Sequence, residues 1–282
     1  MFYPQFPYLA QHRWLLFNDL AQPTPLSPDE SLAFQDSFIR WLPEMSVESP
    51  TAILHYYPIE RPTVLLGAKD TRLPQLQAGL TYLRERGYQY ALRPHGGLGV
   101  VCDPGVLNIG LASNLDYFPL SIDSAYEQMV QLIGLSLAPY GVTVEAYEIP
   151  QSYCPGTYDL VVNGQKIGGI AQRRFKNGIT TAAYLSVNGD QAQRANLMAD
   201  FYRLSQADSS YPLVSKEVMT TIETVIQQPL NLATYQQQLT DLFRHYSIVQ
   251  TGDYAQTTLQ TIYPKMLSVA QQRTDSLHST LH

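Results

Sequence analysis

Two side chains of this 282-residue chain, Cys154 and Lys166, have types and a spacing that could perform acyl chemistry. Cys154 is followed by Pro-Gly, which indicates a loop, and a loop thiol is less often buried and inert. The alternative is that Cys154 is a small buried hydrophobe, as isolated cysteines commonly are. Twelve positions later Lys166 opens a predicted strand. The pair is therefore the first candidate for a reactive centre.

A predicted hairpin could bring Lys166 back to Cys154, because Asn163-Gly164 is the strongest short hairpin signal in the chain. An ammonium about 4 Å from a sulfur would stabilise a thiolate by up to ~4 kcal/mol at an effective dielectric constant of about 20. The thiolate is the nucleophilic form of cysteine. The pair thus predicts a nucleophilic thiol. A lysine that projects into solvent from an edge strand is the alternative for Lys166.

Glycines are concentrated in a second stretch, from Arg93 to Cys102. Gly96, Gly97 and Gly99 lie between two predicted β segments, and they indicate either a turn or a close approach of a ligand to backbone N–H groups. Their spacing matches neither a P-loop nor a dinucleotide-binding loop. The stretch is therefore a candidate ligand-binding loop of another kind.

Two further glycines, Gly168 and Gly169, lie inside the predicted strand that begins at Lys166. Glycine weakens a strand interior, which suggests that a ligand lies against the backbone there. Together with Gly96 and Gly97 they could form the walls of a ligand-binding slot.

Four other residues have two possible roles each. His95 is either an acid or base or a hydrogen-bonded structural histidine. Cys102 follows two valines in an apolar strand and is expected in the core. Arg173 and Arg174 are expected on opposite faces of one strand. One arginine could meet an acidic partner surface while the other pairs locally.

The elements that must position these residues are predicted by hydrophobic period and by caps. Strands are expected at 52–56, 63–66, 88–92, 99–102, 106–111, 143–147, 158–162, 166–174 and 180–185. Helices are expected from Ser27 to Pro43 and at 73–86, 121–139, 190–205, 214–226, 232–246 and 254–273. Because no regular βαβ alternation is present, we expect an α+β fold with a mixed, mostly antiparallel sheet flanked by helices. Residues 1–230 would form the catalytic domain and 231–282 a C-terminal helical extension packed on it.

Composition excludes several classes of function. The formal net charge of −6 argues against nucleic acid as a partner, because phosphate binding needs a basic surface. No apolar run reaches the roughly 20 residues that span a bilayer, and no signal-peptide pattern is visible. We therefore expect a cytoplasmic protein without a membrane partner. Two cysteines form no disulfide framework, and no zinc-type spacing predicts a metal site.

Both chemical segments resemble motifs of the cofactor transferase family that contains lipoate–protein ligases, biotin ligases and octanoyltransferases. The run from Arg93 to Val101 resembles the motif Arg-x-Ser/Thr/Asn-Gly-Gly-x-x-Val, from which His95 and Leu98 depart. The run from Asp159 to Ala171 resembles Asp-Leu-x-x-x-Gly-x-Lys-x-x-Gly-x-Ala. The Ser-Tyr-Cys-Pro-Gly-x-Tyr-Asp-Leu context is most similar to one branch, the octanoyl-[glycine cleavage H protein]:protein N-octanoyltransferases. The resemblance covers roughly positions 30 to 230.

The resemblance implies a class II synthetase/biotin ligase-like fold and a transfer of octanoate from the glycine cleavage H protein to a lipoyl-domain lysine of E2 subunits. No cofactor is implied, since the octanoyl or lipoyl group is itself the substrate. The implied catalytic residues are Cys154 and Lys166, and the implied substrate-binding residues are Arg93, His95, Gly96, Gly97, Gly168 and Gly169.

Three other functions remain open at this point. The first is an octanoyltransferase that takes its acyl group from acyl carrier protein. The second is an ATP-dependent lipoate–protein ligase, which has no need of a thiol at position 154. The third is a non-catalytic protein of the same fold that only binds lipoyl domains.

Overall fold

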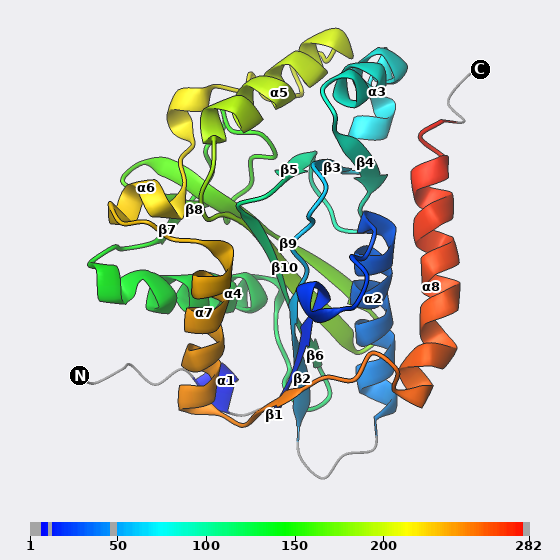
Figure 1. The fold of residues 1–282 in the computed structure, drawn as a ribbon, viewed down its shortest axis with the longest axis vertical. Helices are drawn as coiled ribbons and strands as arrows, with labels where there is room; N and C mark the ends of the chain where they lie inside the picture. The colour runs from blue at the N-terminus through cyan, green and yellow to red at the C-terminus, as the bar shows by residue number, and fades with distance from the viewer. Residues whose placement is uncertain (1–6, 11–12, 46–49, 279–282) are drawn as a thin grey trace.

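A computed structural model describes residues 7–10, 13–45 and 50–278 of the chain. Among these residues, eight strands form one large sheet in the order β11-β1-β2-β6-β10-β9-β8-β7 (Figure 1). Their bounds are β1 Arg13–Asn18, β2 Thr51–Tyr56, β6 Val106–Asn114, β7 Glu145–Ala146, β8 Leu160–Val162, β9 Gln165–Phe175, β10 Gly178–Ser186 and β11 Val249–Thr251. A smaller sheet has the order β4-β3-β5, with β3 Thr63–Leu66, β4 Gln89–Leu92 and β5 Val100–Cys102.

The large sheet is mixed but mostly antiparallel. β1 runs parallel to both of its neighbours, β2 and β11, whereas every pairing from β2 through β6, β10, β9 and β8 to β7 is antiparallel. The predicted α+β class is confirmed. The two strands that the sequence did not predict are β1 and β11, and they form one edge of this sheet.

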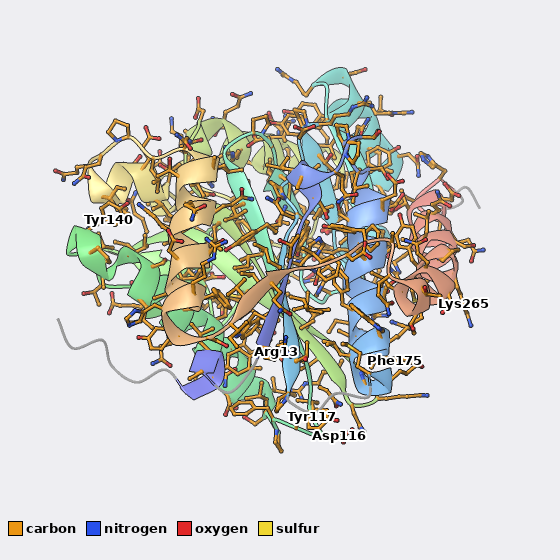
Figure 2. All side chains as sticks on the ribbon, turned by 60° about the horizontal axis from the view of Figure 1, so that its bottom comes forward. Arg13, Asp116, Tyr117, Tyr140, Phe175 and Lys265 are labelled. Carbon is orange, nitrogen blue, oxygen red and sulfur yellow. The ribbon has the colours of Figure 1, made fainter. Side chains whose placement is uncertain are left out.

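Helices cover both faces of the large sheet. Their bounds are α1 Pro7–Ala10, α2 Pro28–Trp41, α3 Leu76–Glu85, α4 Ile122–Leu137, α5 Gln191–Leu204, α6 Ile222–Ile226, α7 Leu232–Tyr246 and α8 Thr257–Asp275. In Figure 1, α2 and α8 lie side by side on one flank, and α4 and α7 lie on the other. Tyr140, just after α4, and Lys265, in α8, are accordingly on opposite sides in Figure 2, where side chains fill the space between the layers.

Alternation along β2 explains why both faces are covered. Ala52, Leu54 and Tyr56 belong to the apolar cluster that also contains α4 and α7, whereas Ile53 packs in the cluster of α2 with Phe34 and Phe38. Successive strand residues point to opposite faces, so a strand that is apolar on both needs a helical layer on each. A third cluster joins the small sheet to α3 and α5.

The predicted start of α2 is confirmed in detail. The Ser27 side chain accepts a hydrogen bond from the Glu30 backbone N–H, and the Glu30 carboxylate accepts one from the Ser27 backbone N–H. This capping box satisfies two backbone donors that the first helical turn leaves free. Pro28 occupies the first turn, where its missing N–H has no consequence.

The C-terminal part of the chain is bound tightly to the rest. Phe243 and Leu239 of α7 are buried against the large sheet, and Leu259 of α8 packs with α2. The division into residues 1–230 and 231–282 stays a prediction. Within the described residues, no helix is both long and apolar enough to cross a membrane.

Candidate active site

The hairpin predicted at Asn163-Gly164 is present and positions Lys166. Val162 pairs with Gln165 across the turn, and both turn residues have positive φ, 50° for Asn163 and 79° for Gly164. This is the conformation that a two-residue hairpin turn of type I′ requires. Lys166 follows in β9, fully buried. The turn therefore directs the lysine into the protein and not toward solvent.

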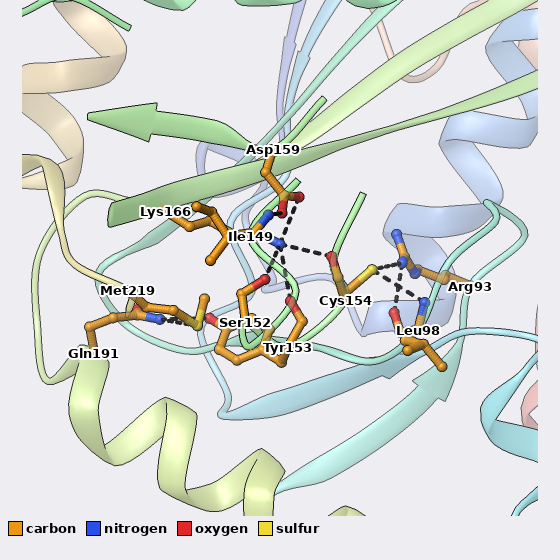
Figure 3. A network of polar contacts seen from close by, with 10 residues as sticks. All are labelled: Arg93, Leu98, Ile149, Ser152, Tyr153, Cys154, Asp159, Lys166, Gln191 and Met219. Carbon is orange, nitrogen blue, oxygen red and sulfur yellow. Dashed lines mark hydrogen bonds and ion pairs between the residues drawn. The ribbon is translucent and has the colours of Figure 1, made fainter. Parts of the chain in front are cut away.

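Cys154 lies in the loop before β8 and is partly buried. Its φ of 48° places a non-glycine residue in the left-handed region, which is uncommon and often found at functional sites. The sulfur accepts two hydrogen bonds, one from the Arg93 guanidinium and one from the Leu98 backbone N–H, both at 3.2 Å. Both donors come from the glycine-rich loop, so that loop and the cysteine loop meet at the sulfur (Figure 3).

Lys166 contacts the same loop from the other side, as Figure 3 shows. Its ammonium forms an ion pair with Asp159 at 2.8 Å and donates to the Ser152 hydroxyl at 3.0 Å and to the Tyr153 carbonyl at 3.1 Å. It also donates to the backbone carbonyl of Cys154 at 2.8 Å. The structure thus brings Lys166 and Cys154 together through the cysteine's backbone, while Arg93 is the cation that contacts the sulfur.

The sulfur borders a cavity of about 240 Å³ between the two sheets. One wall comes from the glycine-rich loop and the other from β9 and β10. Most of the lining is backbone, aliphatic or aromatic surface, with a few polar groups, as small-molecule sites generally have. The lining residues used below are Arg93, His95, Gly97, Cys154, Gly169 and Tyr184.

Three of the four predicted slot glycines line this cavity: Gly96, Gly97 and Gly169. A Cβ on Gly97 would lie 2.8 Å from the Arg93 guanidinium and 2.9 Å from the Cys154 sulfur. Gly168 is not among the lining residues. Its Cβ would instead meet the backbone oxygen of Tyr184 at 2.4 Å, so Gly168 allows β9 and β10 to approach closely.

His95 and Cys102 are both buried, in different surroundings. His95 lines the cavity, and burial together with the nearby guanidinium of Arg93 lowers its pKa to about 3, so the ring is neutral. Its Nε2 has no hydrogen-bond partner among the described residues. Cys102 is fully buried beside Asn108, and burial raises the pKa of its thiol to about 12. The prediction that Cys102 belongs to the core is confirmed.

Arg173 and Arg174 point away from each other and both pair within the chain. Arg173 forms an ion pair with the buried Asp36. Arg174 donates to the backbone carbonyls of Leu120 at 3.1 Å and Ser121 at 2.8 Å. The predicted local pairing thus applies to each arginine.

Sequence reasoning missed two functional groups. Asp159 was part of a recognised motif, but its pairing with Lys166 depends on the loop conformation. Burial is the main cause that raises the pKa of Asp159, and the Lys166 ammonium opposes this rise. The hydroxyl of Tyr184 was missed because strand alternation alone cannot show that it faces a cavity. Among the described residues, no group of three His, Cys, Asp or Glu side chains could hold a metal ion.

Known proteins resemble this chain over most of its length. Residues 27–244 match the family model of the lipoyl protein ligase A/B catalytic domain. An octanoyl-[GcvH]:protein N-octanoyltransferase of Macrococcus caseolyticus is 38% identical over 213 residues, which are 74% of this chain and 76% of that protein. A lipoyl-[GcvH]:protein N-lipoyltransferase of Listeria monocytogenes is 36% identical over 205 residues, or 71% and 72% of the two chains.

The fold is similar to that of a solved bi-partite lipoate protein ligase of Thermoplasma acidophilum, with a TM-score of 0.68 over 95% of this chain and 97% of that one. At 17% identity this similarity concerns the fold alone. The family model and the sequence relatives give evidence beyond the fold. They show that the chain belongs to the lipoyl protein ligase A/B catalytic family and is related to protein N-octanoyltransferases, which are acyltransferase enzymes.

Proposed function

We propose that this protein transfers an octanoyl group from the glycine cleavage H protein to a lipoyl-domain lysine of E2 subunits, through a thioester on Cys154. The observation that carries the proposal is the sulfur of Cys154, which borders an acyl-sized cavity and accepts hydrogen bonds from Arg93 and Leu98. The names of several relatives support the donor and the reaction. The archaeal ligase was studied with its E2 lipoyl domain, which supports the acceptor.

The first half-reaction begins with a thiolate. Hydrogen-bond donation and positive charge at a sulfur favour its ionised form, and the guanidinium of Arg93 supplies both. The sulfur attacks the carbonyl carbon of the octanoyl-lysine on the donor, so a C–S bond forms and the amide C–N bond breaks. The thiol gives up its proton to solvent when it ionises, and the leaving amine takes one proton from solvent as the C–N bond breaks, so the protons balance. The products are octanoyl-Cys154 and a free lysine on the donor.

The second half-reaction reverses these changes on another protein. The amine of the acceptor lysine attacks the thioester carbonyl, a new C–N bond forms and the C–S bond breaks. The proton released by the amine returns to the sulfur. Because one amide is exchanged for another, the overall reaction needs no ATP. A lipoate–protein ligase, which must activate a free carboxylic acid, would need ATP. ATP dependence therefore distinguishes a ligase from an octanoyltransferase.

Lys166 has a supporting role in this scheme. Its ammonium binds two backbone carbonyls of the cysteine loop and the carboxylate of Asp159. These contacts hold Cys154 in its left-handed conformation, with the sulfur directed toward Arg93. A fully buried ammonium is tolerated because it is paired and hydrogen-bonded. Lys166 therefore positions the nucleophile, and Arg93 stabilises its charge.

The proposal is tested by incubation of the protein with octanoyl-H protein in the absence of ATP, followed by intact-mass measurement. We expect one octanoyl adduct that hydroxylamine removes, and no adduct on Cys154→Ala. Cys102→Ala is the matched control, because its thiol is fully buried and protonated, and it should be labelled like the wild type. An adduct on Cys154→Ala, or strict dependence on ATP, would contradict the proposal.

The identity of the acyl group is tested in the same assay. Octanoyl- and lipoyl-loaded H protein are offered in equal amounts, since one relative is named a lipoyltransferase. Octanoyl-acyl carrier protein is the third donor. We expect the fastest adduct formation from octanoyl-H protein. Faster labelling from acyl carrier protein would assign the chain a different donor.

A further inference from the structure

The hydroxyl of Tyr184 is a buried donor without a partner. Tyr184 lies in β10 and is 6% exposed, and its hydroxyl has no hydrogen-bond partner among the described residues. A buried hydroxyl normally finds a partner, since an unpaired one destabilises the folded state. Because Tyr184 is one of the residues that line the cavity, a ligand bound there is the candidate for the missing acceptor.

The side chain of Tyr184 is held at the reacting end of the cavity. It lines the same cavity as Cys154. Its ring stacks on the ring of Tyr153, the residue before the nucleophile, with centroids 5.8 Å apart. The Lys166 ammonium lies 5.8 Å from its centroid. A Cβ on Gly169 would come within 2.9 Å of the ring, so no side chain fits between Tyr184 and β9.

The electrostatic surroundings keep this hydroxyl protonated. Burial is the largest cause that raises the pKa of Tyr184 well above its ordinary value, followed by the neighbouring Tyr153 and Asp159. Tyr184 therefore stays a neutral hydrogen-bond donor at every pH at which the enzyme would work.

The chemistry of the acyl group identifies the missing acceptor. Beyond its carbonyl an octanoyl chain is hydrocarbon, so the carbonyl oxygen is the one acceptor that it can bring. The ammonium of Lys166 has three N–H groups and already has four oxygen partners. Arg93 and the Leu98 N–H donate to the sulfur. The Nε of Arg93 also has no partner among the described residues, but this guanidinium is already engaged at the nucleophile. From β10, Tyr184 offers the acyl oxygen a free donor that has no other task.

We propose that the Tyr184 hydroxyl donates a hydrogen bond to the carbonyl oxygen of the acyl group on Cys154. The inference rests on the proposed thioester. No bond to Tyr184 forms or breaks. As sulfur or amine adds to the carbonyl carbon, the oxygen gains charge and the hydrogen bond strengthens. A fixed donor at a developing oxyanion accelerates acyl transfer because it stabilises the transition state more than the ground state.

His95 offers another unpaired atom in the cavity, its Nε2. Burial and the Arg93 guanidinium lower the pKa of His95, so the ring is neutral. A neutral imidazole donates from only one of its two nitrogens. The hydroxyl of Tyr184 always carries a proton, so Tyr184 is the better candidate for the acyl oxygen.

The test uses Tyr184→Phe, which removes the hydroxyl and keeps the ring stacked on Tyr153. The matched control is Tyr56→Phe, because Tyr56 is also buried, its hydroxyl is bonded to Thr240, and it does not line the cavity. In single-turnover transfer from octanoyl-H protein, Tyr184→Phe should be slowed roughly 100-fold, with KM little changed. Tyr56→Phe should remain near the wild type. Alkylation of Cys154 by iodoacetamide should proceed at wild-type rate in both variants.

Two measurements report on the hydrogen bond itself. With carbonyl-labelled octanoate on Cys154, the infrared stretch of the thioester carbonyl should move to higher frequency in Tyr184→Phe, as expected when a hydrogen bond is lost. The melting temperature of free Tyr184→Phe should rise by about 2–4 °C, because an unpaired buried hydroxyl has been removed. Lost activity with a lowered melting temperature would instead assign Tyr184 a structural role and overturn the inference.

Failure of the inference differs from failure of the proposed function. If the wild type never carries a hydroxylamine-labile octanoyl group, the thioester is rejected, and the acyl contact with it. If wild type and Tyr184→Phe acquire the group at equal rates, with the same carbonyl frequency, the thioester stands and the role of Tyr184 is rejected.

Discussion

At the scale of single residues, the site divides its two cations between different tasks. Arg93 donates to the sulfur of Cys154, whereas Lys166 donates to the backbone carbonyls of Tyr153 and Cys154. From the sequence spacing, Lys166 was expected to be the cation that stabilises the Cys154 thiolate. The spacing could not show that the lysine reaches the loop through carbonyl oxygens, because that depends on the left-handed backbone of Cys154.

This division predicts which cation controls thiol reactivity. Replacement of Arg93 by Met should slow iodoacetamide alkylation of Cys154 at pH 7 by roughly tenfold or more, since loss of about 1.4 kcal/mol of thiolate stabilisation is a factor of ten. Arg174→Met is the control, because Arg174 bonds carbonyls away from the sulfur. Unchanged alkylation in Arg93→Met, together with slow alkylation in Lys166→Met, would show that Lys166 is the residue that stabilises the thiolate.

At the scale of elements, the glycine-rich loop is shaped by one of its glycines more than by the others. Gly97 has a φ of 97°, and a Cβ there would meet both the Arg93 guanidinium and the Cys154 sulfur. Gly96 is exposed, and a Cβ there would have nothing within 4 Å. Neighbouring glycines in one loop thus have very different tolerance of a methyl group.

We expect Gly97→Ala to reduce octanoyl transfer at least 100-fold, because a 1 Å displacement of positioned groups can reduce a rate by that factor. Gly96→Ala should retain activity within a few-fold of the wild type. Both variants should keep the far-UV circular dichroism of the wild type. Equal activity of the two variants would show that the close contacts around Gly97 are not needed for transfer.

Elements were predicted well from the sequence where the hydrophobic pattern and the helix caps or turn residues agreed. They were predicted less well where a strand exists only because it pairs with a distant segment. α2 and the Asn163-Gly164 hairpin carried explicit signals: Pro28 and two acidic residues at the start of the helix, and the Asn-Gly step of a tight turn. β11 has three residues in a segment rich in Gln and Thr, and it is a strand because β1 pairs with it. Pairing between distant segments leaves no local pattern, so β11 could not be predicted from its own residues. β1 is different, because its apolar run from Trp14 to Phe17 is compatible with a strand or a helix and its own residues do not decide between them.

At the scale of the whole molecule, a buried neutral histidine couples the site to global stability. Burial and Arg93 lower the pKa of His95 to about 3, below the value of 6.5 expected in the unfolded chain. Between these values the unfolded chain binds a proton that the folded protein does not. The stability associated with neutral His95 is therefore complete above pH 6.5 and is lost progressively as pH falls toward 3.

His95→Gln should remove this pH dependence. Between pH 6.5 and 5 the wild type should lose about 1.6 kcal/mol more unfolding free energy than the variant, because the slope approaches about 1.4 kcal/mol per pH unit only below the unfolded pKa of 6.5. Urea unfolding at the two pH values measures this difference. Asp70 acts in the opposite direction, since burial raises its pKa to about 6, but it is present in both proteins. Parallel pH profiles would contradict the prediction.

The pairing of β1 with β11 places Trp14 beside Val249. β1 therefore lacks this neighbour until β11, far along the chain, has been synthesised. Until then β1 presents an open edge to other nascent chains, and Trp14 lacks its contact with Phe243. Molecular chaperones that shield strand edges should therefore raise the yield of native protein.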